Sequence, residues 1–137
     1  MHGSHLQDWL SSSADVNWRV NTGQGGSSCA FGDIGVHWCD PVEFVSGHRI
    51  IRLSAQKRSA FASWESASAA TTEDVATVQF ETDHGVVGSL VSQVSPGRKN
   101  RLWFSIEGAE QSLSFDQELP RRYGLARAPL LASCHAA

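Results

Sequence analysis

The sequence predicts an α+β fold: an open, mostly antiparallel β-sheet with one long helix packed on one face. Three observations predict it. Apolar residues recur at helical spacing within residues 27–46. From residue 74 onward they recur at every second position, which is typical of strands. Short turn sequences containing Gly, Pro, Asn or Asp separate these later segments, which favours a meander of antiparallel strands.

The first third of the chain predicts a strand, a loop and then the helix. Residues 1–10 indicate a short strand or strand end, and residues 11–26, rich in Ser, Asn and Gly, indicate mostly loop. Ser27 or Ser28 can cap the helix, and Gly47 stands where a C-terminal glycine is expected. The apolar stripe of the helix repeats at steps of three and four residues: Phe31, Ile34, Trp38, Val42 and Val45.

After the helix, residues 49–56 predict a strand with Ile51, Leu53 and Ala55 on one face. Residues 57–73, rich in Ala, Ser and Thr, predict a connection on the surface. The meander follows, with a hairpin turn at "DHG" (83–85) and a second turn at "SPGRKN". Its core positions are Ala76, Val78, Phe80, Leu90, Val94, Leu102, Phe104, Ile106, Leu113 and Phe115.

The opposite face of the predicted sheet mixes polar, small and aromatic residues, so either solvent or a partner covers it. Its residues are Thr77, Gln79, Glu81, Ser89, Gln93, Trp103 and Ser105. The tail after Pro120 shows neither period, and no structure is assigned to it.

Composition excludes several classes of function. The 137 residues suit one domain, and 14 acidic against 11 basic residues leave a net charge of −3. This charge gives no electrostatic reason to expect nucleic acid or a membrane surface as a partner.

No apolar run is long enough to span a bilayer and no signal peptide follows Met1, so we expect a cytoplasmic protein. The three cysteines lack CxxC spacing and predict free thiols, and the six histidines show no paired ligand spacing, so no metal site is expected.

Asp33 and His37 are the first candidate site residues. Four residues apart on a helix, they project from the same face. A carboxylate orients an imidazole, and histidine suits proton transfer to or from a substrate hydroxyl.

Gly32 and Gly35 are unfavourable in a helix, which indicates close approach of sheet backbone or ligand. Pro41 removes one helical hydrogen bond and is expected to kink the helix beside His37. The alternative is an exposed polar pair that stabilises the helix by only about 0.3 kcal/mol.

A longer pattern resembles a known family. The segments "GSHLQDWL" (3–10), "NWR" (17–19), "DIGVHWCDPVEFVSGHRI" (33–50) and residues 80–118 follow one another as in the C-terminal domain of the glucose–fructose oxidoreductase / inositol dehydrogenase (Gfo/Idh/MocA) family of NAD(P)-dependent oxidoreductases. In that family an Asp and a His in a D-x-x-x-H pattern on this helix face the substrate. The resemblance therefore implies that His37 handles the proton of the reacting hydroxyl. It also implies that Asp33 orients that hydroxyl or the imidazole.

The resemblance also implies that Trp18 and Arg19 line a sugar pocket; the alternative is a Trp at the edge of the core and a surface Arg. Family members begin with a nucleotide-binding domain, whereas this chain has no G-x-G-x-x-G after a strand. Lys57 and Lys99 do not match the family's Glu-Lys-Pro motif, which supplies the catalytic lysine. We therefore expect this chain alone to bind no cofactor, with NAD(P) serving the complete family enzyme.

These expectations assign residues 1–120 to an incomplete Gfo/Idh/MocA-type domain for substrate binding and oligomerisation, and leave residues 121–137 as an unassigned tail. The first hypothesis is one half of an NAD(P)-dependent sugar or polyol dehydrogenase, inactive alone, so whether the chain counts as an enzyme stays open. The alternative is a stand-alone homo-oligomeric binding or assembly module, or a gene fragment, that has lost the chemistry. We expect a homo-oligomer formed through the open sheet face and a sugar or polyol ligand.

Overall fold

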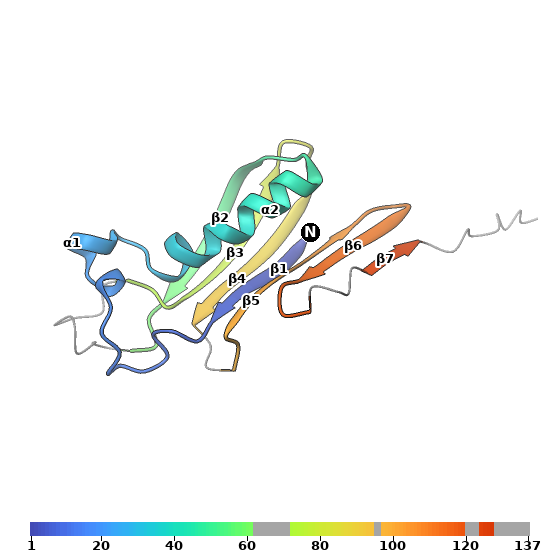
Figure 1. The fold of residues 1–137 in the computed structure, drawn as a ribbon. Coiled ribbons are helices and arrows are strands. Elements are labelled where there is room, and N and C mark those ends of the chain that lie inside the picture. The colour runs from blue at the N-terminus through green and yellow to red at the C-terminus, as the bar shows by residue number, and fades with distance from the viewer. Residues whose placement is uncertain (62–71, 95–96, 120–123, 128–137) are drawn as a thin grey trace, which may run out of the picture.

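The computed structural model describes residues 1–61, 72–94 and 97–119, and the backbone of 124–127 (Figure 1). These residues form one sheet of seven strands with a helical segment across one face, which confirms the predicted α+β fold. The strands are β1 (His2–Gln7), β2 (Ile50–Arg58), β3 (Val75–Thr82), β4 (Val87–Val94), β5 (Asn100–Glu107), β6 (Gln111–Asp116) and β7 (Gly124–Arg127). The helical elements are η1 (Trp18–Val20), α1 (Thr22–Gly25), η2 (Ala30–Gly35) and α2 (Val36–Ser46).

The strand order is β2-β3-β4-β1-β5-β6-β7. Every neighbouring pair is antiparallel except β1 and β4, which run parallel. β1 therefore lies inside the sheet, with His2 opposite Ser89 on one side and Ser105 on the other. The sequence predicts a strand at this position but not its central place. β7, which extends the sheet beyond β6, lies in the tail to which the sequence assigned no structure.

The predicted helix forms, but its winding changes along its length. Its first part, η2, is a π-helix, in which the Val36 N–H reaches five residues back to the Phe31 carbonyl. α2 continues from there through Pro41 and ends at Gly47. Gly47 has a left-handed φ of 72° and donates its N–H to the Glu43 carbonyl at 2.9 Å, as a C-terminal cap.

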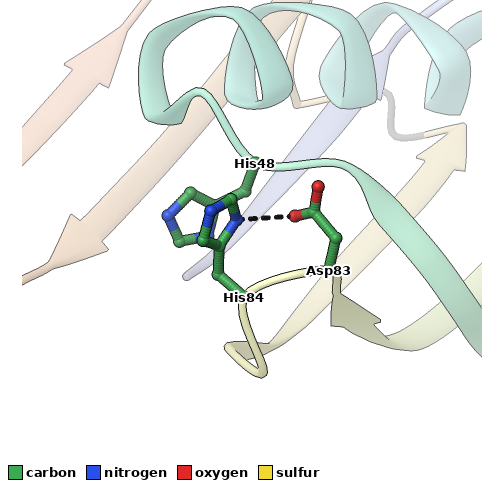
Figure 2. Close-up of side chains that lie close together, drawn as sticks. All are labelled: His48, Asp83 and His84. Carbon is green, nitrogen blue, oxygen red and sulfur yellow. Dashed lines mark hydrogen bonds and ion pairs between the residues drawn. The ribbon is translucent and has the colours of Figure 1, made fainter.

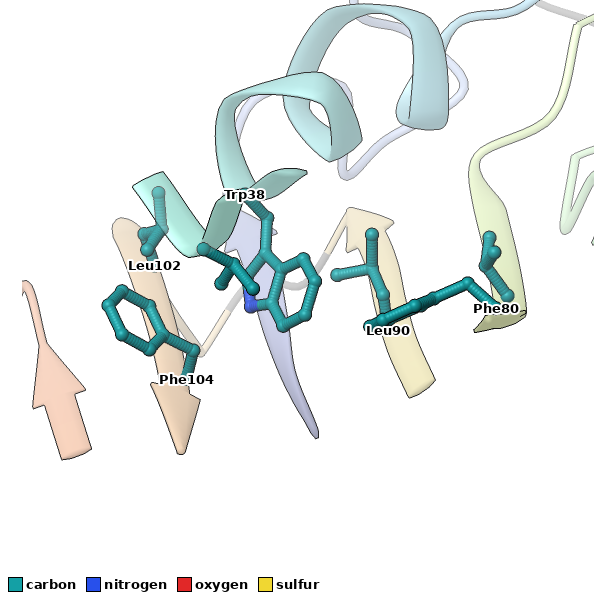
Figure 3. Close-up of a cluster of buried hydrophobic side chains, with 7 residues drawn as sticks. Trp38, Phe80, Leu90, Leu102 and Phe104 are labelled. Carbon is teal, nitrogen blue, oxygen red and sulfur yellow. The ribbon is translucent and has the colours of Figure 1, made fainter. Parts of the chain in front are cut away.

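The core lies between α2 and the middle of the sheet (Figure 3). It comprises Trp38, Val42, Val78, Phe80, Leu90, Leu102 and Phe104. Trp38 is fully buried, and its indole N–H donates to the Trp103 carbonyl at 2.8 Å. This close approach requires Gly3, because a Cβ there would lie 2.3 Å from the Trp38 Nε1 atom. Burial of one such apolar side chain contributes about 2 kcal/mol.

The predicted core positions of the meander lie on this helix-covered face, but two other expectations need correction. Val45 belongs to the predicted apolar stripe, yet it is 47% exposed; it lies in the last turn of α2, just before the Gly47 cap. The segment 57–73 was expected to be a surface connection, but its last described residues, Thr72 and Glu73, are buried. Residues 62–71 of that segment lie outside the described part.

β2 extends past the region that α2 covers. Leu53 and Ala55 pair with Phe80 and Val78 and share their face, while Ile51 falls at an irregularity in the register. Leu53 and Ile51 both stay exposed. The other face of the sheet carries the predicted mixed set of polar, small and aromatic residues, as the strand register requires.

Candidate functional site

A cavity of about 310 Å³ lies where η1 meets η2. It is lined by Trp18, Arg19, Gly25, Ser27, Ser28, Cys29, Gly32 and Asp33. Three of the four residues singled out in the sequence, Trp18, Arg19 and Asp33, therefore meet in one place. Their role in binding a substrate stays a prediction.

Arg19 is the organising side chain of this cavity. Its Nε lies 3.0 Å from the Asp33 Oδ1, and both side chains remain about one-third exposed. Its guanidinium also stacks on two indoles, 4.6 Å from the Trp18 ring and 5.3 Å from the Trp9 ring. The Asn17 side chain caps η1 by accepting the Arg19 N–H at 3.0 Å. The guanidinium is thus held in one orientation at the rim of the cavity.

His37 lies one turn further along, at the start of α2, and is exposed. Its imidazole contacts the His5 ring edge-on, with centroids 6.3 Å apart. The described contacts of Asp33 and His37 thus go to different partners, Arg19 and His5. The wider winding of η2 lies between the two positions, so the α-helical spacing assumed in the sequence does not hold there.

His5 is a residue that sequence reasoning missed. It is buried on β1, and both of its ring nitrogens face oxygen atoms. Nδ1 lies 2.6 Å from the Ile34 carbonyl and Nε2 lies 3.0 Å from the Asn100 Oδ1. His5 therefore ties η2 to two strands and supports the ring of His37. Its only signal in the sequence is a histidine one position before the single leucine of a short strand.

Glu73 is the second missed residue, and it holds the start of η2. Its Oε1 accepts the Ser28 hydroxyl at 2.5 Å and the Phe31 N–H at 3.0 Å, and its Oε2 lies 3.4 Å from the Lys57 ammonium. Burial of the carboxyl group raises its pKa, but the hydrogen bonds from Ser28, Phe31 and its own backbone N–H, together with the Lys57 ammonium, outweigh burial and leave the pKa below its ordinary value. Because 42 residues separate Phe31 from its partner, no local pattern reveals the contact.

The thiol at the wall of the cavity is not an activated nucleophile. Burial, followed by the nearby carboxylates of Glu73 and Asp33, raises the pKa of Cys29 to about 11. Burial likewise raises the pKa of Cys39 to about 11. Both cysteines are free, as the sequence predicts, and Cys134 lies outside the described residues. A neutral thiol leaves proton transfer and hydrogen bonding as the chemistry of this region.

Solved structures share this architecture. An oxidoreductase domain protein from Kribbella flavida is 27% identical with a TM-score of 0.76, over 93% of this chain and 38% of that one. A levoglucosan dehydrogenase in complex with NADH and levoglucosan is 26% identical with a TM-score of 0.86, over 96% and 36%. An inositol dehydrogenase homologue from Azotobacter vinelandii, in complex with NADH and myo-inositol, is 26% identical with a TM-score of 0.72, over 93% and 32%. The chain thus spans between 32% and 38% of the length of these three proteins.

A search among curated protein sequences found no match. Every helix in the described part of the chain is too short or too polar to cross a membrane. The sequence model of the GFO/IDH/MocA C-terminal domain family matches residues 1–114, which is most of the chain. The chain therefore belongs to the Gfo/Idh/MocA C-terminal domain family.

Proposed function

We propose that this chain is the substrate-binding and oligomerisation domain of an NAD(P)-dependent sugar or polyol dehydrogenase and that it is inactive alone. The observation that carries the proposal is the cavity at Arg19 and Asp33, with His37 one turn further along the helical segment, in a domain of this family. Similar solved structures hold NADH together with levoglucosan or myo-inositol, which supports a polyhydroxylated ligand.

The chemistry of the cavity suits such a ligand. The Arg19 guanidinium donates hydrogen bonds and the Asp33 carboxylate accepts them, so adjacent hydroxyl groups can bind both at once. The exposed Trp18 ring offers an apolar surface to the C–H face of a sugar ring. The cavity volume, about 310 Å³, is at the lower end for small-molecule sites and suits one ring.

His37 is the residue that we assign to proton transfer. Its exposed imidazole can accept the proton of a hydroxyl group while His5 limits the orientation of its ring. NAD(P) would supply hydride acceptance in the complete enzyme. The sequence contains no G-x-G-x-x-G turn for the nucleotide. The Lys57 ammonium forms an ion pair with the Glu73 carboxylate. These two facts support inactivity of the chain alone.

The binding half of the proposal is tested by titrating myo-inositol and levoglucosan into the labelled chain while the indole N–H signals are followed by NMR. We expect the Trp18 signal to shift in the wild type and not in Arg19→Ala. Arg52→Ala is the matched control, because Arg52 pairs with Glu81 at an exposed position of the sheet. No shift at 100 mM of either ligand would count against a polyol site.

The activity half is tested separately, by incubating the pure chain with the same polyols and either NAD or NADP. We expect no reduced nucleotide to form. Turnover by the pure chain would show that the chain is not inactive alone, whatever the result of the binding experiment.

The assembly role rests on the open face of the sheet, whose central strands expose Gln79 and Ser89 and half-bury Trp103. A charge placed there should weaken association between copies of the chain. We expect light scattering to show an oligomer that Gln79→Arg converts toward monomer. Phe44→Arg, on the exposed side of α2, should leave the mass unchanged. A strictly monomeric wild type at high concentration would contradict this role.

The same measurements separate the alternative, a stand-alone assembly module. In that case His37→Ala keeps the oligomer, and neither it nor the wild type binds a polyol. If the chain retains a functional pocket, His37→Ala keeps the oligomer but loses polyol binding.

A further inference from the structure

Two histidines and an aspartate that are distant in sequence meet at the other end of α2 (Figure 2). His48 follows the helix cap, whereas Asp83 and His84 lie in the turn between β3 and β4. One potential ligand atom from each residue lies within 4.8 Å of the other two. The sequence, in which 35 positions separate His48 from Asp83, shows no paired ligand spacing and gives no sign of this cluster.

The backbone holds the two segments in place. The Asp83 N–H donates to the Arg49 carbonyl at 2.9 Å, and the Arg49 N–H donates to the Asp83 Oδ1 at 2.9 Å. The turn itself is closed by the Thr82 N–H on the Val86 carbonyl at 2.9 Å, and by Gly85, whose φ is 74°. The relative positions of the two backbone segments are thus set by hydrogen bonds that do not involve the imidazoles.

The side chains already interact in a way that suits a shared ligand. The two imidazole rings lie 4.4 Å apart with an interplanar angle of 30°. The His84 Nδ1 lies 2.8 Å from the Asp83 Oδ1, and the His48 Nδ1 lies 3.3 Å from the Thr82 hydroxyl. Asp83 and His84 are exposed and His48 is half-buried, so the cluster is open to solvent.

We propose that His48, Asp83 and His84 form a binding site for Zn²⁺, with water as the remaining ligand. Imidazole nitrogen and carboxylate oxygen are common zinc ligands, with bonds of about 2.1 Å. Tetrahedral geometry then places ligand atoms about 3.4 Å apart. The present separations, at most 4.8 Å, exceed this value by at most about 1.4 Å, a difference that the proposed site would close by side-chain rotation.

The surrounding charges permit a cation. The Arg49 side chain is the cationic neighbour, and its guanidinium is paired with the Glu43 carboxylate at 2.8 Å. Glu43 also accepts the Ile50 N–H at 2.8 Å, which holds that pair at the side of the cluster. The cluster is separated from Arg19 and Asp33 by the length of α2, about 16 Å. A zinc ion here would join the α2–β2 corner to the β3–β4 turn, apart from the polyol site.

The test is a titration of Zn²⁺ into the full 137-residue chain in competition with a chromophoric chelator. We expect one ion per chain. His48→Gln and His84→Gln should each weaken binding about tenfold or more, and the double variant should abolish it. Glutamine keeps a polar side chain at these surface positions, and a circular dichroism spectrum of each variant verifies the fold.

His37→Gln is the matched control, since it removes an exposed histidine outside the cluster, and its zinc affinity should equal that of the wild type. The histidine ring protons provide a second measurement: zinc should shift those of His48 and His84 and leave those of His37 in place. The proposal is overturned if the wild type does not bind zinc at 100 µM, or if the double variant binds as tightly as the wild type. The latter result would assign the ion to other groups, such as Cys134 and His135.

Discussion

The two ends of the helical segment are anchored by different kinds of contact. At its start, η2 is held by two buried polar side chains, Glu73 and His5, which come from distant parts of the chain. At its end, α2 is held by Gly47 and by two hydrogen bonds between Arg49 and Asp83, one between backbone groups and one from the Arg49 N–H to the exposed Asp83 carboxylate. A buried polar group that loses its partner is penalised far more than an exposed one. The start, where the candidate polyol site lies, should therefore tolerate substitution much less than the end.

The largest effect is expected from Glu73→Ala at the start of η2. It leaves the Ser28 hydroxyl and the Phe31 N–H without their acceptor, and we expect the free energy of unfolding to fall by about 3 kcal/mol. Urea unfolding of the variant and the wild type measures this difference in free energy. Glu73→Gln is the control, because its side-chain oxygen can still accept both hydrogen bonds, and it should lose about half as much. If both variants match the wild type, the contrast between the two ends is wrong.

The pH dependence of stability provides a second test of the contribution of Glu73. The folded-state pKa of Glu73 lies below its ordinary value of 4.5, so its ionised form stabilises the fold above pH 4.5. That contribution is lost as the pH falls through the lower folded-state pKa. The difference in stability between the wild type and Glu73→Gln should therefore shrink in unfolding experiments below pH 4.5. A difference that stays constant down to pH 2 would show that the charge contributes nothing.

A smaller loss is expected from His5→Phe. Phenylalanine fits the buried position roughly in size but leaves the Ile34 carbonyl without a donor, which costs about 2 kcal/mol. Gln7→Ala is the control, since Gln7 contacts the same Asn100 side chain from an exposed hydrogen bond and should cost less than about 0.5 kcal/mol. Thermal unfolding of the two variants tests the difference; equal losses would contradict it.

The smallest effect is expected at the end of α2, from Gly47→Ala. A Cβ at Gly47 would meet no neighbour within 4 Å, so only the left-handed φ of 72° opposes alanine, at about 1 kcal/mol. Gly97→Ala, where a Cβ also meets nothing and φ is not left-handed, should be neutral or slightly stabilising. Urea unfolding of the Gly47→Ala and Gly97→Ala variants measures how much the left-handed φ alone lowers the free energy of unfolding. A loss at Gly47 as large as that for Glu73→Ala would overturn the comparison.

Local patterns were sufficient for most of the fold. The helical spacing of Ile34, Trp38 and Val42 and the two-residue period of the meander predict the core and the antiparallel strands, because each is a property of a single element. The π winding of η2 and the central position of β1 were not predictable in this way, since both depend on contacts between distant residues. β7 is four residues long and too short to show a period.

The candidate site shows the same division. Trp18, Arg19 and Asp33 were chosen from local sequence and a family resemblance, and folding brings them to one cavity. The residues that hold this cavity together, Glu73 and His5, could not be chosen, because a carboxylate in a Ser/Thr-rich segment and a histidine near the start of a strand are usually exposed. Their significance lies in partners 42 and 29 positions away.

The position of β1 between β4 and β5 also constrains how the chain acquires its structure. β1 is made before its partners, which are residues 89–94 and 100–105. At a ribosomal rate of about 5–20 residues per second, this strand waits roughly 5–20 s with both edges unpaired. Its sequence, "HGSHLQ", contains a single leucine among polar residues and glycine. Such a strand offers little apolar edge for aggregation during that delay, at the cost of a late, non-local step that closes the sheet.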